Sequence, residues 1–374
     1  MGVYTVGHDT RRQPDLTIVI PVRNEAAHIR SVLAQIFAQT LAPERYEVLV
    51  VDGFSEDGTR SIVREIAIEH PNLYLLDNPQ FISGAARNVG VLHAAAPYVL
   101  FIDGHCRLES PDLLATSLAA FERGERCLSR PQPLASEGVT AFQTAVALAR
   151  SSWLGHQVGS QIFSDQDHHC SPLSAGCGYE RGFYASLGGI DEAFDAGEDL
   201  EFNLRVRDAG VQALHSRLFA VTYMPRGSWW ALFRQLYRYG YGRARMARKH
   251  PGTTSALAMA LGLMSLGFVL LPLAGLAWTP AMHLWLGSLG IYAAVSLAVG
   301  SWAARGRGVG IAARVALCFP AIHLGAGLGH LSGLCGGFSW RHTPSRAARQ
   351  RLAAESARQA REAQAPGNAG DPAR

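Results

Sequence analysis

Acidic residues stand at three points where a predicted strand ends or a predicted helix begins. Asp52 closes the apolar run in VVDGFSEDGT, Asp103 closes the run in VLFIDGH, and Glu198-Asp199 opens a helix in AGEDLEFNLRV. Ligands of open α/β sheets bind beyond the carboxyl ends of the strands. Carboxylates placed there can accept hydrogen bonds from a ribose or base, hold a cation, or take a proton from a hydroxyl group.

Each of these positions also has a structural interpretation. An aspartate after a strand can cap the next helix, although that role fits Asp57 better than Asp52. Asp103 precedes a glycine and could simply form a turn. The pair Glu198-Asp199 could have the purely structural role of capping the helix and interacting with its dipole. A further acidic pair, Asp191-Glu192, follows two glycines and is expected to be structural.

The sequence Asp-Gly-His offers two ligands for a divalent metal ion, the carboxylate of Asp103 and the imidazole of His105. A bound Mg²⁺ or Mn²⁺ would act as a Lewis acid toward a diphosphate leaving group, and Mn²⁺ tolerates imidazole better. The neighbouring residues His168, His169 and Cys170 favour a plain loop, because adjacent residues rarely chelate one ion alone.

Apolar runs alternate with helical patterns in the first hundred residues, which predicts a mostly parallel, doubly wound α/β sheet. The expected strands are Leu16–Val22, Glu47–Asp52, Asn72–Leu76 and Pro97–Asp103, and the expected helices between them are 23–39, 59–69 and 83–95. Beyond Asp103 we expect helices at 111–124 and 200–208, a strand at 128–135, and a helix followed by a loop within 136–167.

Charge divides the chain into two parts. Only 3 of the 30 acidic residues lie after Asp208, against 18 of the 34 basic ones, and His250–Ala304 contains no charged side chain at all. Those 55 residues are long enough for two membrane spans. Basic residues flank the apolar runs, which fits an anionic membrane leaflet, and no nucleic-acid recognition motif accompanies them. We therefore expect membrane lipids, not nucleic acid, as partners.

The basic clusters on either side of 250–304 predict that both ends of this region face the cytoplasm. The N-terminus has no apolar signal core, which places the first domain there as well. A third apolar stretch, 315–340, is followed by an arginine-rich tail. It either crosses the membrane against the charge rule or forms a re-entrant or interfacial hairpin. Its glycines at 325, 329 and 333 permit close helix packing.

The segment Ser228–Lys249 is rich in aromatic residues and arginine and leads directly into the first span. That composition favours the headgroup region of a membrane, although an ordinary helix that closes the first domain is the alternative.

Together these motifs resemble the family 2 glycosyltransferases with a GT-A fold, and within them the succinoglycan-type glucosyltransferases of exopolysaccharide assembly. The matching pieces are TIVIPVRNE, VVDGFSEDGT, GAARNVGVLHAAAPYVLFIDGH, SAGCGYERGFYASLGGIDEAF, GEDLEFNLRV and QLYRYGYGR. The expected organisation is a polar tail (1–15), a GT-A domain (16–227), an interfacial helix (228–252), a membrane region of two or three hydrophobic segments (253–340) and a basic tail (341–374).

The resemblance implies roles for individual residues. Asp199 would be the general base with Glu198 beside it, and Asp103 and His105 would match the ends of the family's metal motif. The residues expected at the nucleotide sugar are Pro21, Arg23, Glu25, Asp52, Arg87, Asn88 and Asp103, and those expected on the acceptor side are Gln235, Arg238 and Tyr239. The metal motif ends in His instead of Asp, and the QxxRW element of processive synthases here has Tyr239 in place of Trp.

The implied activity is an inverting transfer from a nucleotide sugar, with UDP favoured over GDP, to a lipid-linked or membrane-proximal saccharide. The enzyme would be a multi-pass protein of the plasma or inner membrane. Alternatives are a processive polysaccharide synthase, a non-catalytic nucleotide-binding scaffold, and a dinucleotide-dependent enzyme. The last would require GxGxxG after the first strand, where this chain has VIPVRNEAAHI.

Overall fold

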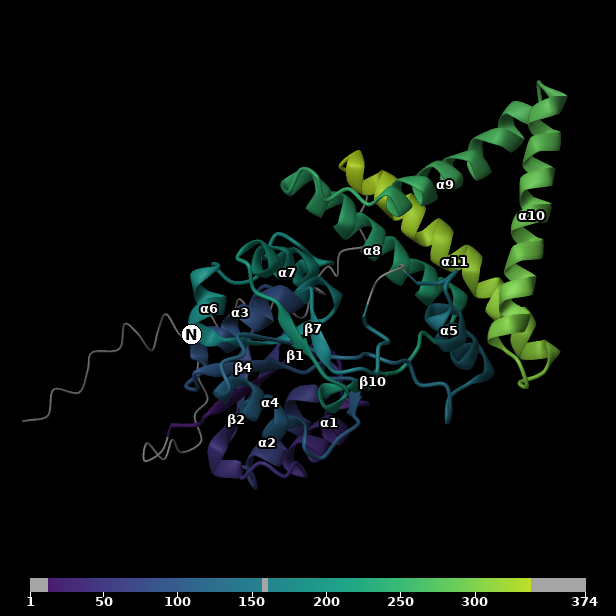
Figure 1. Cartoon of the computed structure of the whole chain (residues 1–374). Coiled ribbons are helices and arrows are strands. Elements are labelled where there is room, and N and C mark those ends of the chain that lie inside the picture. Colours follow the sequence, from purple (N-terminus) through teal and green to yellow (C-terminus); the bar gives the residue numbers. More distant parts are fainter. Residues whose placement is uncertain (1–12, 157–160, 338–374) are drawn as a thin grey trace, which may run out of the picture.

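The computed structural model describes residues 13–156 and 161–337. Within them, an α/β domain precedes four long helices that lie to one side of it (Figure 1). The predicted tail 1–15 lies mostly outside the described residues, and the predicted tail 341–374 lies entirely outside them.

An eight-stranded sheet forms the centre of the domain, in the order β3-β2-β1-β4-β8-β6-β9-β7. Strands β1 to β4 run parallel, whereas β8 is antiparallel to both β4 and β6, so the sheet is mixed and doubly wound as predicted. A small antiparallel pair, β5 and β10, lies beside it. The strands are β1 (Leu16–Val22), β2 (Tyr46–Asp52), β3 (Leu73–Asp77), β4 (Tyr98–Phe101), β5 (Cys106–Leu108), β6 (Cys127–Ser129), β7 (His168–Cys170), β8 (Gly176–Glu180), β9 (Ala213–His215) and β10 (Val221–Tyr223).

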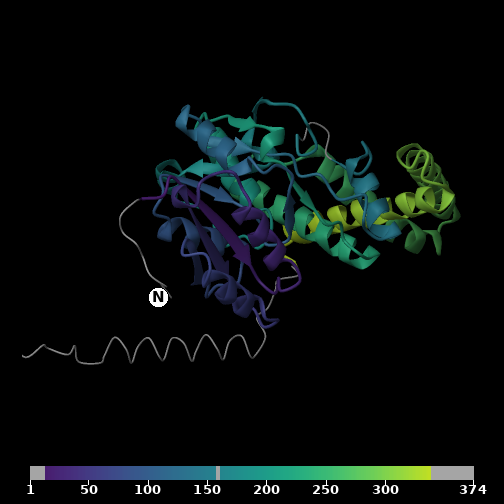
Figure 2. The ribbon, with the colours of Figure 1, turned by 90° about the horizontal axis from the view of Figure 1, so that it is seen from below.

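Helices cover both faces of the sheet, because the strands alternate apolar side chains between two cores. Helices α1, α2 and α4 pack on one face, and α3, α6 and α7 pack on the other (Figure 2). These helices are α1 (Ile29–Phe37), α2 (Thr59–Ala67), α3 (Ser83–His93), α4 (Leu113–Glu122), α6 (Arg181–Ser186) and α7 (Glu198–Asp208), and α5 (Ala141–Ser151) lies apart from them beside the long helices.

The first helix begins six residues later than predicted, at Ile29. The backbone N–H groups of Asn24, Glu25 and Ala26 donate instead to side chains of the loop after β2, at 2.8, 2.8 and 3.0 Å. These bonds hold residues 23–28 as a loop that connects the ends of β1 and β2.

The predicted strand 128–135 pairs in the sheet only as β6. Pro131 and Pro133 follow it, and proline cannot donate a hydrogen bond to a neighbouring strand. Their carbonyl groups instead accept hydrogen bonds from Val221 and Tyr223 of β10, at 3.2 and 2.9 Å.

The long helices are α8 (Trp229–Lys249), α9 (Ala256–Gly275), α10 (Thr279–Ala303) and α11 (Val309–Leu334). The last three are long and apolar enough to span a membrane, with mean hydropathies of 2.2, 1.5 and 1.6. Helix α11 continues through Pro320 to Leu334, so the third apolar stretch is one helix as far as Leu334, and the alternative of a hairpin there is wrong.

Glycines of α11 allow it to lie directly against α8, as the four-residue spacing predicted (Figure 1). A Cβ atom on Gly329 would lie 2.0 Å from the carbonyl oxygen of Tyr237, and one on Gly325 would lie 2.7 Å from that of Phe233. The two backbones therefore approach too closely for any side chain at these positions.

Gly329→Ala should consequently destabilise the protein, by about 2 kcal/mol, the usual cost of overpacking. We expect a fall of several degrees in the Tm of the detergent-solubilised chain. Gly290→Ala is the matched control, because a Cβ atom on Gly290 of α10 meets nothing within 4 Å. Helix propensity alone would make both variants slightly more stable, so equal Tm values would contradict the packing described here.

Candidate active site

The carboxyl ends of β1, β2 and β4 meet at one edge of the sheet. Val22 pairs in register with Asp52, and Val19 pairs with Phe101, two residues before Asp103. The loops that follow these strands therefore begin side by side, as expected for a ligand site in an open sheet.

Asp52 is fully buried, yet one of its carboxylate oxygens accepts no hydrogen bond from the residues that the structure describes. Its Oδ2 accepts hydrogen bonds from Arg60 at 2.8 Å and from the Ser55 N–H at 3.0 Å. Its Oδ1 is buried without a hydrogen-bond partner. A buried unpaired oxygen is costly, so this atom is suited to a donor group of a ligand.

Strained backbone surrounds the same corner. Asn24, Phe54 and Phe81 have φ values of 57°, 57° and 65°, in the left-handed region that non-glycine residues seldom adopt. Arg23 lies over the ring of Phe81 at 5.3 Å, with a buried Nη1 that has no hydrogen-bond partner. Such strain persists only where surrounding contacts impose it, and it gathers at ligand sites. No sequence motif marks the two phenylalanines.

Asp103 lies beyond β4 and is bonded through both carboxylate oxygens. It accepts hydrogen bonds from Arg87 at 3.2 Å and from the hydroxyl of Tyr223. Burial alone would raise the pKa of Asp103, but Arg87, His105 and Tyr223 outweigh it and lower that pKa to about 2. Asp103 is therefore ionised at any physiological pH. Tyr223 was not predicted, because β10 has only three residues and no motif marks it.

His105 is held by Glu25, whose Oε1 lies 2.9 Å from the Nδ1 of the imidazole. This hydrogen bond raises the pKa of His105. A carboxylate on one ring nitrogen orients the other toward a metal in many metalloenzymes, so the Nε2 of His105 is the atom suited to a metal ion. Glu25 therefore binds the ring nitrogen of His105 that is not the predicted metal-binding atom.

A divalent ion fits this site only together with a ligand. Within residues 13–156 and 161–337, no group of three His, Cys, Asp or Glu residues is arranged to hold a metal ion. Asp103 and His105 supply two donors of the kind that Mn²⁺ accepts, an oxygen and an imidazole nitrogen. Phosphate oxygens of a nucleotide would complete the coordination.

Arg87 connects this corner to the start of α7. Its Nη1 donates to Glu198 at 3.1 Å, while its Nη2 donates to Asp103. Burial raises the pKa of Glu198, and the neighbouring charge of Asp199 raises it further. The structure thus brings together the residues of two predicted clusters, 103–105 and 198–199, around one guanidinium group.

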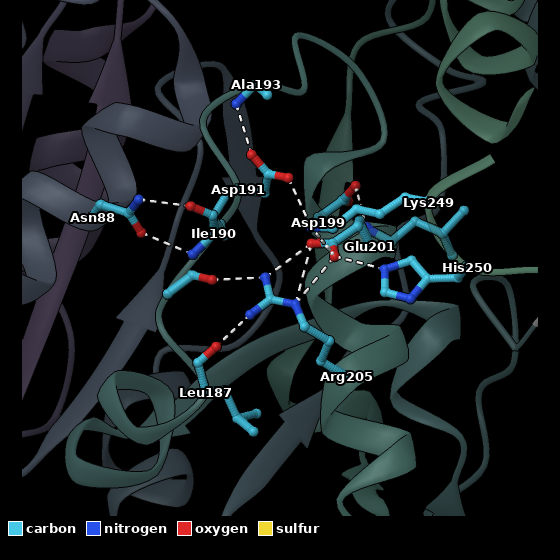
Figure 3. A network of polar contacts seen from close by, with 12 residues as sticks. Asn88, Leu187, Ile190, Asp191, Ala193, Asp199, Glu201, Arg205, Lys249 and His250 are labelled. Atoms are coloured by element: carbon cyan, nitrogen blue, oxygen red, sulfur yellow. Dashed lines mark hydrogen bonds and ion pairs between the residues drawn. The ribbon is translucent and has the colours of Figure 1, made fainter. Parts of the chain in front are cut away.

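Asp199 occupies the first turn of α7, where its Oδ1 accepts a hydrogen bond from the Leu200 N–H at 2.8 Å. A dense polar network fixes this helix (Figure 3). Arg205 binds Glu201 at 2.8 Å and the carbonyl of Gly189 at 2.7 Å, and Lys249 at the end of α8 binds Glu201 at 2.8 Å. The network holds the helix that carries Asp199 against both the preceding loop and α8.

Asn88 is committed to protein contacts. Its amide donates to the Ile190 carbonyl and to Glu192 at 2.8 and 2.9 Å, and it accepts from the Ile190 N–H and the Tyr184 hydroxyl at 2.9 and 2.8 Å. These four bonds exhaust the amide, so Asn88 positions the loop before α7 (Figure 3). The acidic pair at 191–192 has contacts of the structural kind expected for it.

Of the acceptor-side residues predicted on α8, Arg238 is linked to the start of α7. Arg238 donates to the carbonyl of Asp195 at 2.6 Å, and its charge acts to lower the pKa of Glu198. Gln235 donates to the hydroxyl of Tyr239 at 3.1 Å, and Tyr239 is 44% exposed. Pro21 lies half-buried in β1, one residue before that strand ends.

A separate hollow of about 800 Å³ includes Pro97 and Tyr98 among its lining residues. These residues stand at the amino end of β4, opposite the end that leads to Asp103, although the lining of the hollow also includes Asn88.

Asp52→Asn is expected to weaken nucleoside-diphosphate binding about tenfold, since a hydrogen bond to a charged group contributes about 1.5–3 kcal/mol. Asparagine has nearly the same shape as aspartate, but its side chain carries no negative charge. Asp77→Asn is the control, because Asp77 also binds Arg60, at 2.6 Å. Calorimetric titration with UDP and GDP should show the loss in the first variant alone. An unchanged Kd for Asp52→Asn would remove Asp52 from the nucleotide site.

A comparison with a family model and a comparison with individual proteins agree with each other. The model of Glycosyl transferase family 2 matches residues 17–176. The chain is 32% identical over 301 residues to the succinoglycan biosynthesis protein ExoA of Rhizobium meliloti (strain 1021), covering 78% of this chain and 86% of that protein.

Two further similarities extend across the catalytic domain. One is to the dolichyl N-acetyl-alpha-D-glucosaminyl phosphate 3-beta-D-2,3-diacetamido-2,3-dideoxy-beta-D-glucuronosyltransferase of Methanococcus voltae, at 24% identity over 63% of this chain and 74% of that one. The other is to the structure of the mannosyltransferase PcManGT from Pyrobaculum calidifontis with GDP-Man and Mn²⁺, at 19% identity and a TM-score of 0.48, over 95% of this chain and 83% of that one.

Proposed function

We propose that this chain, which belongs to glycosyl transferase family 2, moves a sugar from a nucleoside-diphosphate donor to a hydroxyl group of a lipid-linked saccharide, with inversion at the anomeric carbon. As a member of that family it is a glycosyltransferase of polysaccharide or glycoconjugate biosynthesis. The observation that carries the finer proposal is the bridge from Asp103 through Arg87 to Glu198, which joins the end of β4 to the helix of Asp199.

The donor is assigned to the corner formed by the ends of β1, β2 and β4. The unpaired oxygen of Asp52 and the unpaired nitrogen of Arg23 support binding of the base and ribose there. We favour UDP over GDP on family resemblance. Asp103 and His105 would hold Mn²⁺ or Mg²⁺, which when bound neutralises charge on the departing diphosphate.

The reaction is assigned to Asp199. Its carboxylate takes the proton from the acceptor hydroxyl, whose oxygen attacks the anomeric carbon as the bond to the diphosphate breaks on the opposite side. A single displacement of this kind inverts the configuration. Arg87 is assigned to stabilise the negative charge that develops on the leaving group.

The acceptor is assigned to the side of α8 and the apolar helices. We propose that α9, α10 and α11 anchor the enzyme as a multi-pass protein in the plasma or inner membrane, with the catalytic domain in the cytoplasm. Arginines at 305, 307 and 314 support this orientation. An anchor confines enzyme and acceptor to one surface and raises their effective concentration.

Transfer from a panel of radiolabelled UDP- and GDP-sugars, with native membranes as the source of acceptor, tests the proposal. We expect one donor to label the lipid fraction with one or a few sugars, because the QxxRW element is altered at Tyr239. Long products would instead identify a processive synthase. Nucleotide binding without turnover of any donor would identify a scaffold.

A further inference from the structure

Two arginines that lie between the α/β domain and the apolar helices have no partner among the residues that the structure describes. Arg150 is near the end of α5, and Arg243 is in the second half of α8. Both are only partly accessible, and across residues 13–156 and 161–337 neither donates a hydrogen bond or forms an ion pair. Guanidinium groups in protein interiors are normally paired, so their isolation calls for a counter-charge.

Packing of α8 brings Arg243 close to the catalytic helix. A Cβ atom on the adjacent Gly242 would lie 2.2 Å from the carbonyl oxygen of Ala196, just before α7. On the other side, a Cβ atom on Gly240 would lie 2.1 Å from the carbonyl oxygen of Ala326 in α11. Helix α8 therefore passes directly between the turn before Asp199 and an apolar helix.

Helix α5, which carries Arg150, lies against the apolar helices. Helix α5 packs on α11 through a shared apolar cluster (Figure 1). Beyond α5, His156 is near enough to Arg150 and Arg243 for their charges to act on its ring, and its buried Nε2 has no hydrogen-bond partner among the described residues. Burial and these two arginines lower the pKa of His156 to about 4, so the ring is neutral and available to donate or accept.

The charges of this cluster do not balance. Burial lowers the pKa of both Arg150 and Arg243, and Asp199 is the carboxylate that opposes the effect at Arg243. The charge of Asp199 also acts on Arg87, and one carboxylate cannot neutralise both Arg150 and Arg243. An uncompensated buried charge costs free energy unless a ligand supplies the opposite charge.

We propose that Arg150 and Arg243 bind the phosphate group that links the acceptor saccharide to its lipid carrier. The inference rests on the proposed glycosyl transfer and names the acceptor group that the enzyme recognises. The donor diphosphate is assigned instead to Arg87, Asp103 and His105. Because Arg243 is within electrostatic reach of Asp199, the bound phosphate lies close to the attacking hydroxyl, and the acceptor is a short lipid-linked saccharide.

Binding of farnesyl diphosphate to the detergent-solubilised full chain tests the site without requiring turnover. We expect Arg150→Gln and Arg243→Gln to weaken binding at least tenfold, and Arg234→Gln, an exposed arginine of the same helix, to leave it unchanged. Farnesol, which lacks the phosphates, should not bind. Equal binding by all variants would overturn the proposal, and so would displacement by phosphatidylglycerol, which would identify a site for bulk lipid.

Measurements of turnover distinguish a failure of the proposed phosphate site from a failure of the proposed glycosyl transfer. In native membranes the two variants should lose transfer to the lipid fraction at least tenfold while keeping the Kd for the donor nucleotide. A raised donor Kd would instead place the arginines at the donor diphosphate. If the wild-type chain binds farnesyl diphosphate through these arginines but uses no nucleotide sugar, glycosyl transfer fails as the function and the anion site stands.

Stability provides a readout that distinguishes ligand binding from a structural role. Without ligand, Arg150→Met removes an unpaired, only partly exposed charge, so we expect the Tm to stay the same or rise by a few degrees. A fall of several degrees together with unchanged farnesyl diphosphate binding would show that Arg150 supports the fold, and would overturn the assignment.

Discussion

Replacing Asp199 with Asn is expected to slow sugar transfer by a factor of about 10²–10⁴, the usual contribution of a positioned general base. The amide has nearly the same shape and can still accept the hydrogen bond from the Leu200 N–H. It cannot take up a proton from the acceptor hydroxyl. Binding of the nucleotide, which we propose lies toward the ends of β1, β2 and β4, should remain within about a factor of two of the wild-type value.

The measurement is initial-rate transfer from the radiolabelled donor found in the donor screen, with the nucleotide Kd determined on the same preparations. Asp191→Asn is the matched control, because Asp191 lies on the loop before α7 and pairs with Lys249 at 2.7 Å. It carries the same chemical change and should keep nearly full activity. Near-normal turnover of Asp199→Asn would mean that another group accepts the proton, and Glu198, the other carboxylate at this turn, would be tested next.

The strand ends that lead to Asp52 and Asp103 could be predicted because their signals are local. The strands that lead to Asp52 and Asp103 are continuous apolar runs, and the acidic residue after each run marks the point where burial ends. Parallel strands bring such ends to one edge of a sheet. Family resemblance then supplied Asp199, since an acidic pair at a helix start is by itself equally well explained by the helix dipole.

The partners of these residues depended on tertiary contacts that no local pattern reports. Glu25 was assigned to the nucleotide, yet its carboxylate lies 2.9 Å from His105, 80 residues further along the chain. Tyr223 meets Asp103 only because β10 pairs with β5, the strand that follows the metal motif. The start of α1 was mispredicted for the same reason, because three distant side chains capture the backbone of 24–26.

The cationic cluster of Arg150 and Arg243 was missed because its two members lie on different helices. On α8, Arg243 is one of several arginines that together indicate an interfacial helix, and nothing in the sequence separates it from Arg234 or Arg248. Helix packing makes the distinction. Arg243 adjoins Gly242, whose Cα hydrogen faces the turn before α7, whereas Arg234 and Arg248 are exposed.

Arg87 is the residue whose loss should affect both stability and activity. It is mostly buried, with 13% of its side chain exposed, and stands between Asp103 and Glu198, whose side chains are 24% and 13% exposed. The ring of Phe101 lies 5.7 Å from its guanidinium carbon. Arg87→Ala would leave two carboxylates without the cation between them. Breaking a buried ion pair in this way costs about 3–5 kcal/mol, so a large fall in Tm is expected.

Arg87→Lys separates the two effects. A lysine keeps the charge and most of the stability, but its single ammonium group cannot present two nitrogens in the fixed geometry that reaches Asp103 and Glu198 together. If the bridge aligns the donor diphosphate with the catalytic helix, kcat/KM for the donor should fall by about 10²–10³, as when one stabilising hydrogen-bond donor is removed, while the Tm changes little. Arg126→Lys controls for the substitution itself, since Arg126 is a half-exposed arginine that binds Glu180 at 2.8 Å. Full activity in Arg87→Lys would show that a positive charge suffices at this position and that the two-sided bridge is dispensable.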